Sequence, residues 1–228
     1  EGVIQNVQNS LSLLQLQDNS LQTVGKILDR MAELRTLAQD ITKNTGDVEN
    51  YTKEFVELQG QLQQIKSETF NGVSLFAANG ESGNAFGNTS ASVTEVTTNG
   101  SQTLTFDKYS RTLYTHPNGQ TDDGSISINL VNLEFVLSIG TLQSGGNANL
   151  GDIGSGNVTN VNSDGIGTDG FIDDIMEVSV GQLTRAIERL ADVRAENGAE
   201  QNRALQVLDM LSSNLTNLEA AHGRIMDA

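Results

Sequence analysis

The sequence predicts an α+β protein, with a long antiparallel helical bundle or coiled-coil rod and a small β-rich insert at one end. Apolar residues recur at spacings of three and four through both ends of the chain, which indicates long amphipathic helices. Between the ends lies a stretch rich in Gly, Ser, Thr and Asn with short alternating segments, which indicates strands and loops. Aromatic residues make up only 4% of the 228 residues, and this suits elongated helices with a thin core.

The first domain, residues 1–76, is expected to form a helical hairpin. One helix carries its apolar face on Ile4, Val7, Leu11, Leu14, Leu21, Val24, Leu28, Met31, Leu34, Ala38 and Ile41. Asp18 and Gly25 are its weak points, and Thr45-Gly46-Asp47 is expected to interrupt it. A second helix follows with Tyr51, Phe55, Leu58, Leu62 and Ile65 on one face.

The helical pattern ends at ETFNGVSLF (residues 68–76), where Asn71-Gly72 separates two short apolar runs. This dipeptide is the strongest local signal for a tight β-hairpin turn. Residues 77–170 form the predicted insert, because SVTEVTT, TLTFDKY and SISINLVNLEFVLSIG alternate apolar and polar residues. The insert is therefore expected to be a small β region with long surface loops.

The third domain, residues 171–228, returns to helical spacing. Its apolar face follows Ala204, Leu208, Leu211, Leu215, Leu218, His222 and Ile225, the pattern of a coiled-coil seam. Asp173 and Asp174 suit a helix N-terminus electrostatically. The two helical ends of the chain are expected to pack against each other.

Composition and charge argue against several classes of protein. A formal net charge of -16 repels nucleic acids and anionic membranes, and no Lys/Arg cluster offsets it locally. No apolar run approaches the roughly 20 residues that span a bilayer. The chain has no cysteine and only two histidines, His116 and His222, so thiolate and three-His metal sites are excluded and a catalytic set of nucleophile, base and orienting group is not expected. We therefore expect no enzyme, no cofactor and no metal centre.

One loop resembles the first half of a calcium-binding loop. Asn160, Asn162 and Asp164 place oxygen atoms at alternate positions before Gly165. The twelfth position of such a loop takes a bidentate Glu, whereas this chain has Phe171 there. A solvated Asn/Asp/Gly loop is the favoured interpretation.

Several motifs resemble bacterial flagellin, whose two similar ends enclose a variable middle. They are LDRMAEL (residues 28–34), ETFNGVSLF (68–76), VRAENGAEQNR (193–203) and NLTNLEAAHGRIMDA (214–228). The resemblance covers roughly the first 76 and the last 58 residues. It implies a filament subunit exported through the flagellar channel and located outside the cell. It also implies as partners other flagellin subunits, an export chaperone and a cap protein.

The resemblance further implies terminal helices that form the inner tube of the filament, which this sequence lacks. We therefore expect the chain to be a core-domain fragment that is monomeric. Its implied subunit-packing residues are Gly198, Gln201, Asn202, Arg203, Leu208, Leu211, Leu215 and Arg224. Gly in a helix costs about 1 kcal/mol relative to Ala, and polar seam residues such as Asn197 restrict register. The hypothesis is that this stretch tunes packing between subunits, and its alternative is a simple local weakness.

The resemblance also implies an innate-receptor contact, because some flagellins are bound by a Toll-like receptor through an Arg, a Leu and a Glu. LDRMAEL places the first two on Arg30 and Leu34. Counting back from Phe70-Asn71-Gly72 places the third at Lys53, beside Glu54, and Glu54 supplies the matching carboxylate.

Two other functions remain open at this point. The hook–filament junction protein has similar end motifs, although NGAEQNR and RIMDA favour flagellin. From a different class, the glycine-rich middle could be a surface adhesin or cation-binding module on a helical stalk.

Overall fold

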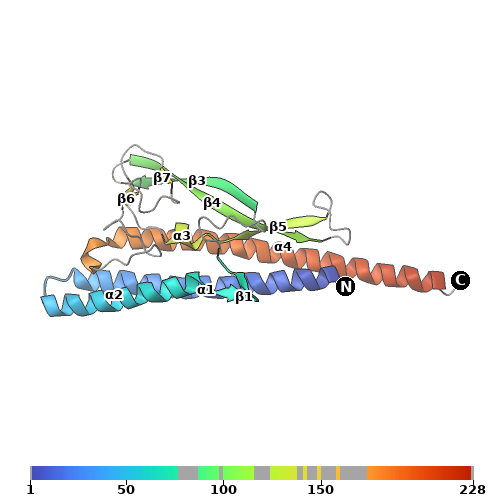
Figure 1. Ribbon diagram of the computed structural model, residues 1–228, viewed down its shortest axis with the longest axis horizontal. Coiled ribbons are helices and arrows are strands. Elements are labelled where there is room, and N and C mark those ends of the chain that lie inside the picture. The colour runs from blue at the N-terminus through green and yellow to red at the C-terminus, as the bar shows by residue number, and fades with distance from the viewer. Residues whose placement is uncertain are drawn as a thin grey trace.

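The computed structural model describes residues 2–76, 87–97, 100–115, 124–137, 141–142, 148–149, 158–159 and 174–226. Three long helices run side by side as a rod, and the strands lie along one side of it (Figure 1). The helices are α1 (Gly2–Ala38), α2 (Thr45–Lys66) and α4 (Val180–Met226). Because α1 runs against both α2 and α4, the rod is an antiparallel bundle (Figure 1), as the sequence predicted.

The turn between α1 and α2 differs from the prediction. Asp40 accepts hydrogen bonds from both the backbone N and the hydroxyl of Thr42, at 2.9 and 2.8 Å. This local bonding competes with continuation of the helix, so α1 ends at Ala38 and Ile41 lies in the turn, 99% exposed. The predicted interruption at residues 45–47 is instead the first turn of α2, because Asn44 and Asp47 form a capping box.

The short hairpin after α2 is confirmed. Strands β1 (Thr69–Phe70) and β2 (Val73–Ser74) pair antiparallel around Asn71 and Gly72, both of which have positive φ. Asn and Gly are the residues that tolerate this backbone conformation. The hairpin is tied to α1, because Gln17 donates to the carbonyl of Leu75 at 2.9 Å.

The main sheet is formed by β3 (Gly87–Thr97), β4 (Gly100–Tyr114) and β5 (Ser125–Leu130), in the order β3-β4-β5. The short strand β7 (Ala148–Asn149) pairs parallel with β4, and β6 (Thr141–Leu142) pairs with β8 (Val158–Thr159). Two short helical segments, α3 (Leu133–Val136) and η3 (Ile175–Glu177), complete the described elements. Asp174 begins η3 by accepting from the backbone N of Met176.

The α+β class is confirmed, but the sheet lies along the flank of the rod rather than beyond its end. Leu113 of β4 and Ile128 of β5 pack with Val7 and Leu14 of α1 and with Ala204 of α4. The apolar face of the sheet therefore completes a core that two helices alone would leave open to water. Periodicity along the chain contains no information about this placement.

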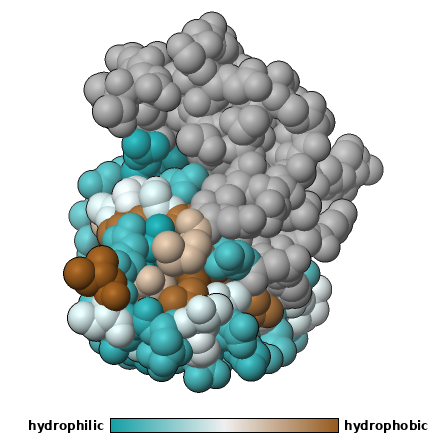
Figure 2. All heavy atoms as spheres, turned by 90° about the vertical axis from the view of Figure 1, so that its left-hand side faces the viewer, coloured by the Kyte–Doolittle hydropathy of each residue, from teal (hydrophilic) through white to brown (hydrophobic). Residues whose placement is uncertain are grey.

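The larger part of the core fills the space between α1, α2 and α4. Its fully buried side chains include Leu21, Leu28, Met31, Phe55, Leu62 and Leu183. Figure 2 looks onto the end of the rod where α1 turns into α2 and shows apolar groups at the surface of this end, bordered by hydrophilic ones. Except at Ile41 and along the last turns of α4, the apolar stripes predicted from spacing are the faces that meet in the rod.

Candidate subunit-packing surface

The polar stretch ENGAEQNR lies inside α4, and part of it faces α1. Asn197 is only 3% exposed, and its Nδ2 donates to the backbone carbonyl of Leu14 at 3.0 Å. The half-buried Gln201 donates to the same carbonyl at 3.3 Å. These two amides therefore fix the register of α4 on α1 within one chain, because they can reach that carbonyl in only one alignment of the helices.

Two of the glycines in the rod helices, Gly25 and Gly198, differ in what surrounds them. A Cβ added at Gly198 meets nothing within 4 Å, whereas one at Gly25 comes within 3.2 Å of Leu190 Cδ2. At Gly25, which the sequence marked as a weak point of the helix, α1 therefore packs closely against Leu190 of α4. Sequence reasoning missed this role because the partner residue, Leu190, is far away along the chain.

The predicted packing residues divide into two groups. Gln201, Leu208, Leu211 and Leu215 are half-buried, and Leu208 and Leu211 pack on the cluster around Val7 and Leu14. By contrast, Asn202, Arg203 and Arg224 are exposed. Arg203 forms an ion pair with Glu200 one turn earlier, at 2.7 Å. The exposed group is the more accessible to another molecule.

The last turns of α4 expose the rest of the predicted seam. Leu218, Ile225 and Met226 are 68%, 75% and 73% exposed. Leu218 and Ile225 line a shallow groove with Ala221 and His222. The histidine of the seam thus lies at the surface, and nothing in the described part of the chain covers this groove.

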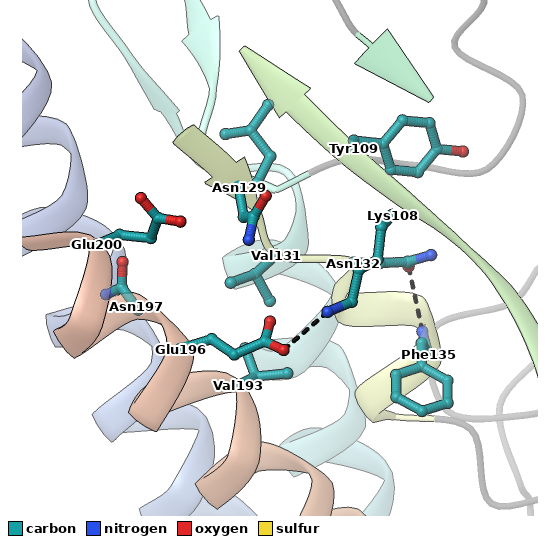
Figure 3. A pocket seen from close by; sticks show the side chains of 11 residues that line it. Lys108, Tyr109, Asn129, Val131, Asn132, Phe135, Val193, Glu196, Asn197 and Glu200 are labelled. Atoms are coloured by element: carbon teal, nitrogen blue, oxygen red, sulfur yellow. Dashed lines mark hydrogen bonds and ion pairs between the residues drawn. The ribbon is translucent and has the colours of Figure 1, made fainter. Parts of the chain in front are cut away.

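A small pocket lies where the sheet meets α4 (Figure 3). Lys108 of β4 and Glu196 of α4 form an ion pair across it at 2.7 Å. Phe135 also lines this pocket, and Arg189 lies 5.2 Å from its ring centre, which adds a cation–π contact between α4 and α3. The cavity volume there is about 30 Å³, which is enough room for water.

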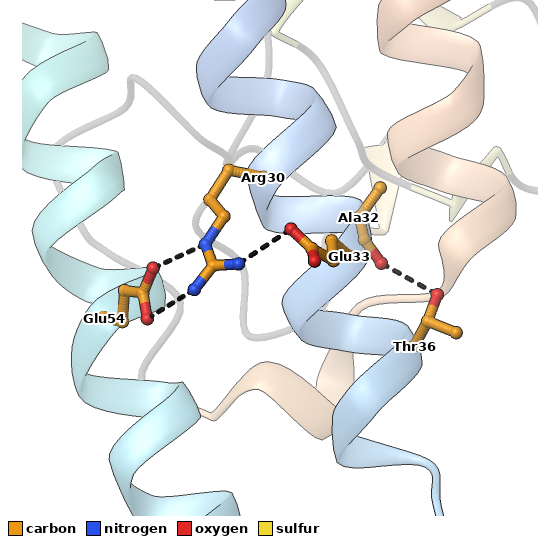
Figure 4. A network of polar contacts seen from close by, with 5 residues as sticks. All are labelled: Arg30, Ala32, Glu33, Thr36 and Glu54. Carbon is orange, nitrogen blue, oxygen red and sulfur yellow. Dashed lines mark hydrogen bonds and ion pairs between the residues drawn. The ribbon is translucent and has the colours of Figure 1, made fainter.

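Two of the predicted receptor residues, Arg30 and Glu54, belong to a polar network on α1 and α2 (Figure 4). Arg30 binds Glu54 through two hydrogen bonds, at 2.7 and 3.1 Å, and Glu33 through one at 2.7 Å. Hydrogen bonds to Glu54 and then to Glu33 raise the pKa of Arg30. Glu54, rather than Lys53, is therefore the residue paired with Arg30.

Leu34 does not belong to this surface. Its side chain is 0% exposed and lies in the core of the rod. The prediction that Leu34 contacts a receptor is therefore wrong. Periodicity already placed Leu34 on the apolar face of the helix, and packing against the rest of the core buries that face completely.

A second arginine, Arg35, joins the start of α4 to α1. It is buried, its Nε donates to the carbonyl of Val178, and burial lowers the pKa of its guanidinium. A charged group in such a place needs hydrogen-bonding partners. Sequence reasoning missed Arg35 because the carbonyl that it binds is 143 residues away.

The remaining sequence predictions concern metal binding, turns and membrane spans. His116, Asp173, Phe171 and the loop 160–165 lie outside the described residues. Within the described ranges, no group of three or more His, Cys, Asp or Glu side chains is placed to hold a metal ion. No helix of that part has the length and apolar character needed to cross a bilayer.

Comparison with known proteins gives matches among solved structures. Neither a protein-family model nor a curated protein matches the sequence. Among solved structures, the chain is similar to Bacillus cereus flagellin, with a TM-score of 0.56 and 21% sequence identity. The match covers 96% of this chain and 94% of that one. The protein therefore has a flagellin-like fold along almost its whole length.

Proposed function

We propose that this chain is a structural subunit of a bacterial flagellar filament, without enzymatic activity. The observation that supports this most strongly is the likeness of fold to a flagellin over 96% of the chain. A second support is independent of the fold, because the motifs NGAEQNR and RIMDA occur at the C-terminal end of the sequence. Fold alone does not define function, and it is the agreement of fold and motifs that favours this proposal.

The surface of the rod fits a protein that packs against copies of itself. The distal part of α4 exposes Leu218, Ile225 and Met226, which a filament would remove from water. Asn202, Arg203 and Arg224 face outward from the same helix and are the polar residues that we assign to contacts between subunits. An extracellular location, export through the flagellar channel, and binding to an export chaperone and a cap protein belong to the same proposal.

A receptor contact is proposed with two of the three predicted residues. Arg30 and Glu54 remain, because their side chains are 41% and 42% exposed. Since each already binds the other, a receptor would have to compete with this ion pair or recognise it as a unit. Binding of the purified receptor ectodomain to the wild-type chain and to Arg30→Ala, compared by surface plasmon resonance, tests the contact. Equal binding by both proteins would exclude Arg30, and no binding at all would exclude the partner.

The filament function can be tested by locating the protein on the cells that carry its gene. Antibodies raised against this chain, with immunogold electron microscopy, are expected to label filaments along their whole length. Deletion of the gene is expected to remove both filaments and label. Label confined to the base of each filament would identify a hook–filament junction protein, and label on the cell body away from filaments would favour an adhesin.

A further inference from the structure

Strand β3 is an edge strand whose outer side has no partner in the part of the chain that the structure describes. Its one partner there is β4, and their register runs from Gly87↔Ser110 to Thr97↔Gly100. The other side of β4 is occupied by β5 and β7. The main contacts of the helices with the sheet are made by β4 and β5, and Ser92 in the middle of β3 is exposed.

The register determines which backbone groups face outward. Two residues separate Thr97 from Gly100, so this pair closes the hairpin as a hydrogen-bonded pair. In an antiparallel ladder, every second residue then bonds to the partner strand. The residues that alternate with these do not bond to β4, and their backbone N–H and C=O groups point away from it. We call these five residues the free edge: Asn88, Ser90, Ser92, Thr94 and Val96.

The free edge lacks the features that usually prevent edge strands from pairing. Natural edges carry Lys, Pro or bulges, or are very short. Here β3 and β4 pair over all 11 residues of β3 without a bulge. Residues 87–106 contain no proline and one charged residue, Glu95, whereas 18% of the whole chain is charged. Segments of this kind, rich in Thr and Val, favour strand pairing.

We propose that the free edge is a self-association surface, on which β3 of a second copy pairs antiparallel. The pairing is centred on Ser92, which lies opposite Ser92 of the second copy. Ser90 of one copy then lies opposite Thr94 of the other, and Asn88 opposite Val96. Each pair exchanges two backbone hydrogen bonds, so every outward-facing group of the free edge is used. The single charge, Glu95, lies opposite Thr89, and no like charges meet. Elsewhere the net charge of -16 makes two copies repel, so this weakly charged strand is the favoured contact.

The contact is small and therefore weak. One pair of strands buries less surface than the roughly 1,200 Å² of a stable interface. The chain is expected to be monomeric when dilute and to form dimers when concentrated. This inference concerns the chain by itself and does not depend on the filament function, and the immunogold result leaves it untouched.

Sedimentation velocity of the 228-residue chain, from about 10 μM to about 1 mM, tests the proposal. The sedimentation coefficient, extrapolated for non-ideality, is expected to rise from the monomer value toward the dimer value. Ser92→Lys places two ammonium groups opposite each other at the centre of the pairing and is expected to abolish the rise. Ser213→Lys, at an exposed position of α4, adds the same charge elsewhere and is the matched control.

The two Lys variants distinguish pairing of the β3 strands from non-specific association of the chains. Because the chain is acidic, an added Lys lowers repulsion between copies, so a non-specific association would increase in both variants. A wild-type chain that stays monomeric throughout, or equal association of wild type and Ser92→Lys, would overturn the proposal. Far-UV circular dichroism confirms that both variants are folded.

Amide hydrogen exchange gives a second test that needs no variant. At high concentration, the amides of the free edge are expected to gain protection, whereas those of Thr89, Ala91 and Val93, already bonded to β4, change little. This alternation is specific to pairing along the outer side of β3. Protection that appears instead on the distal turns of α4 would place the contact on the helix and overturn the proposal.

Discussion

The two halves of α4 have the same helical spacing of apolar residues but opposite environments. In the first half, Leu183, Ala186 and Leu190 are buried against α1 and α2. In the second half, Leu218 and Ile225 are mostly exposed. The change occurs near Leu208 and Leu211, which lie against the first turns of α1. Periodicity thus predicts which face of a helix seeks a partner, and only the presence of the partner makes that face a core.

The largest expected effect comes from truncating equivalent leucines in the two halves. Leu190→Ala should lower the free energy of unfolding by about 2–5 kcal/mol, because it leaves a cavity in a packed core. Leu218→Ala should change it by less than about 0.5 kcal/mol, because the side chain is already in water. Urea denaturation followed by circular dichroism measures both values. Similar losses for the two variants would show that the distal half is covered in solution.

The second comparison is between two asparagine side chains of α4, one that faces α1 (Asn197) and one that faces solvent (Asn202). Asn197→Ala removes a buried hydrogen bond to Leu14 and should cost about 1–2 kcal/mol of unfolding free energy. Asn202→Ala, five residues later on the exposed face, should cost less than about 0.5 kcal/mol. Thermal melting of the two variants side by side measures the difference. If Asn202→Ala proved as destabilising as Asn197→Ala, the assignment of inward and outward faces would be wrong.

Substitution of Gly25 or Gly198 by Ala is expected to have a smaller effect. Gly198→Ala should stabilise the protein by up to about 1 kcal/mol, because Ala has the higher helix propensity and there is room for its methyl group. Gly25→Ala gains the same propensity, but its methyl group must displace the end of Leu190. We therefore expect Gly25→Ala to be less stabilising than Gly198→Ala. Denaturant midpoints rank the two variants, and the reverse order would contradict a close approach of α1 and α4 at Gly25.

The smallest expected effect is that of the surface network on α1 and α2. Arg30→Gln removes two ion pairs that are open to solvent, and exposed pairs contribute little to stability. The melting temperature should fall slightly at low ionic strength and by less at high salt, because salt screens these charges. Arg224→Gln, on the exposed end of α4, is the control. A large loss that persists in high salt would mean that Arg30 is a structural part of the rod.

Local signals predicted much of the fold. The spacing of apolar residues predicted the three long helices, and Asn71-Gly72 predicted the hairpin. The end of α1 was misplaced because Ile41 continues the apolar spacing, while the bonding of Asp40 to Thr42 ends the helix. Local polar bonding overrides a periodic pattern where the pattern has no partner to pack against.

The candidate surface was predicted less well than the fold. Sequence motifs located the polar stretch of α4, but they did not separate Asn197 and Gln201, which bind α1, from Asn202 and Arg203, which face outward. They also assigned Leu34 to a receptor surface although it is in the core. Motif matching records which residues occur together, and burial depends on elements distant in the chain.

The sequence by itself determined the three amphipathic helices, the hairpin turn and the acidic surface, because each depends on residues a few positions apart or on composition. Tertiary structure alone decided that the sheet covers the flank of the rod through Leu113 and Ile128, and that Gly25 faces Leu190. It also brought Arg35 to Val178. The physical reason is that burial and close approach depend on which distant surfaces meet, and a linear pattern of residues does not specify those pairs.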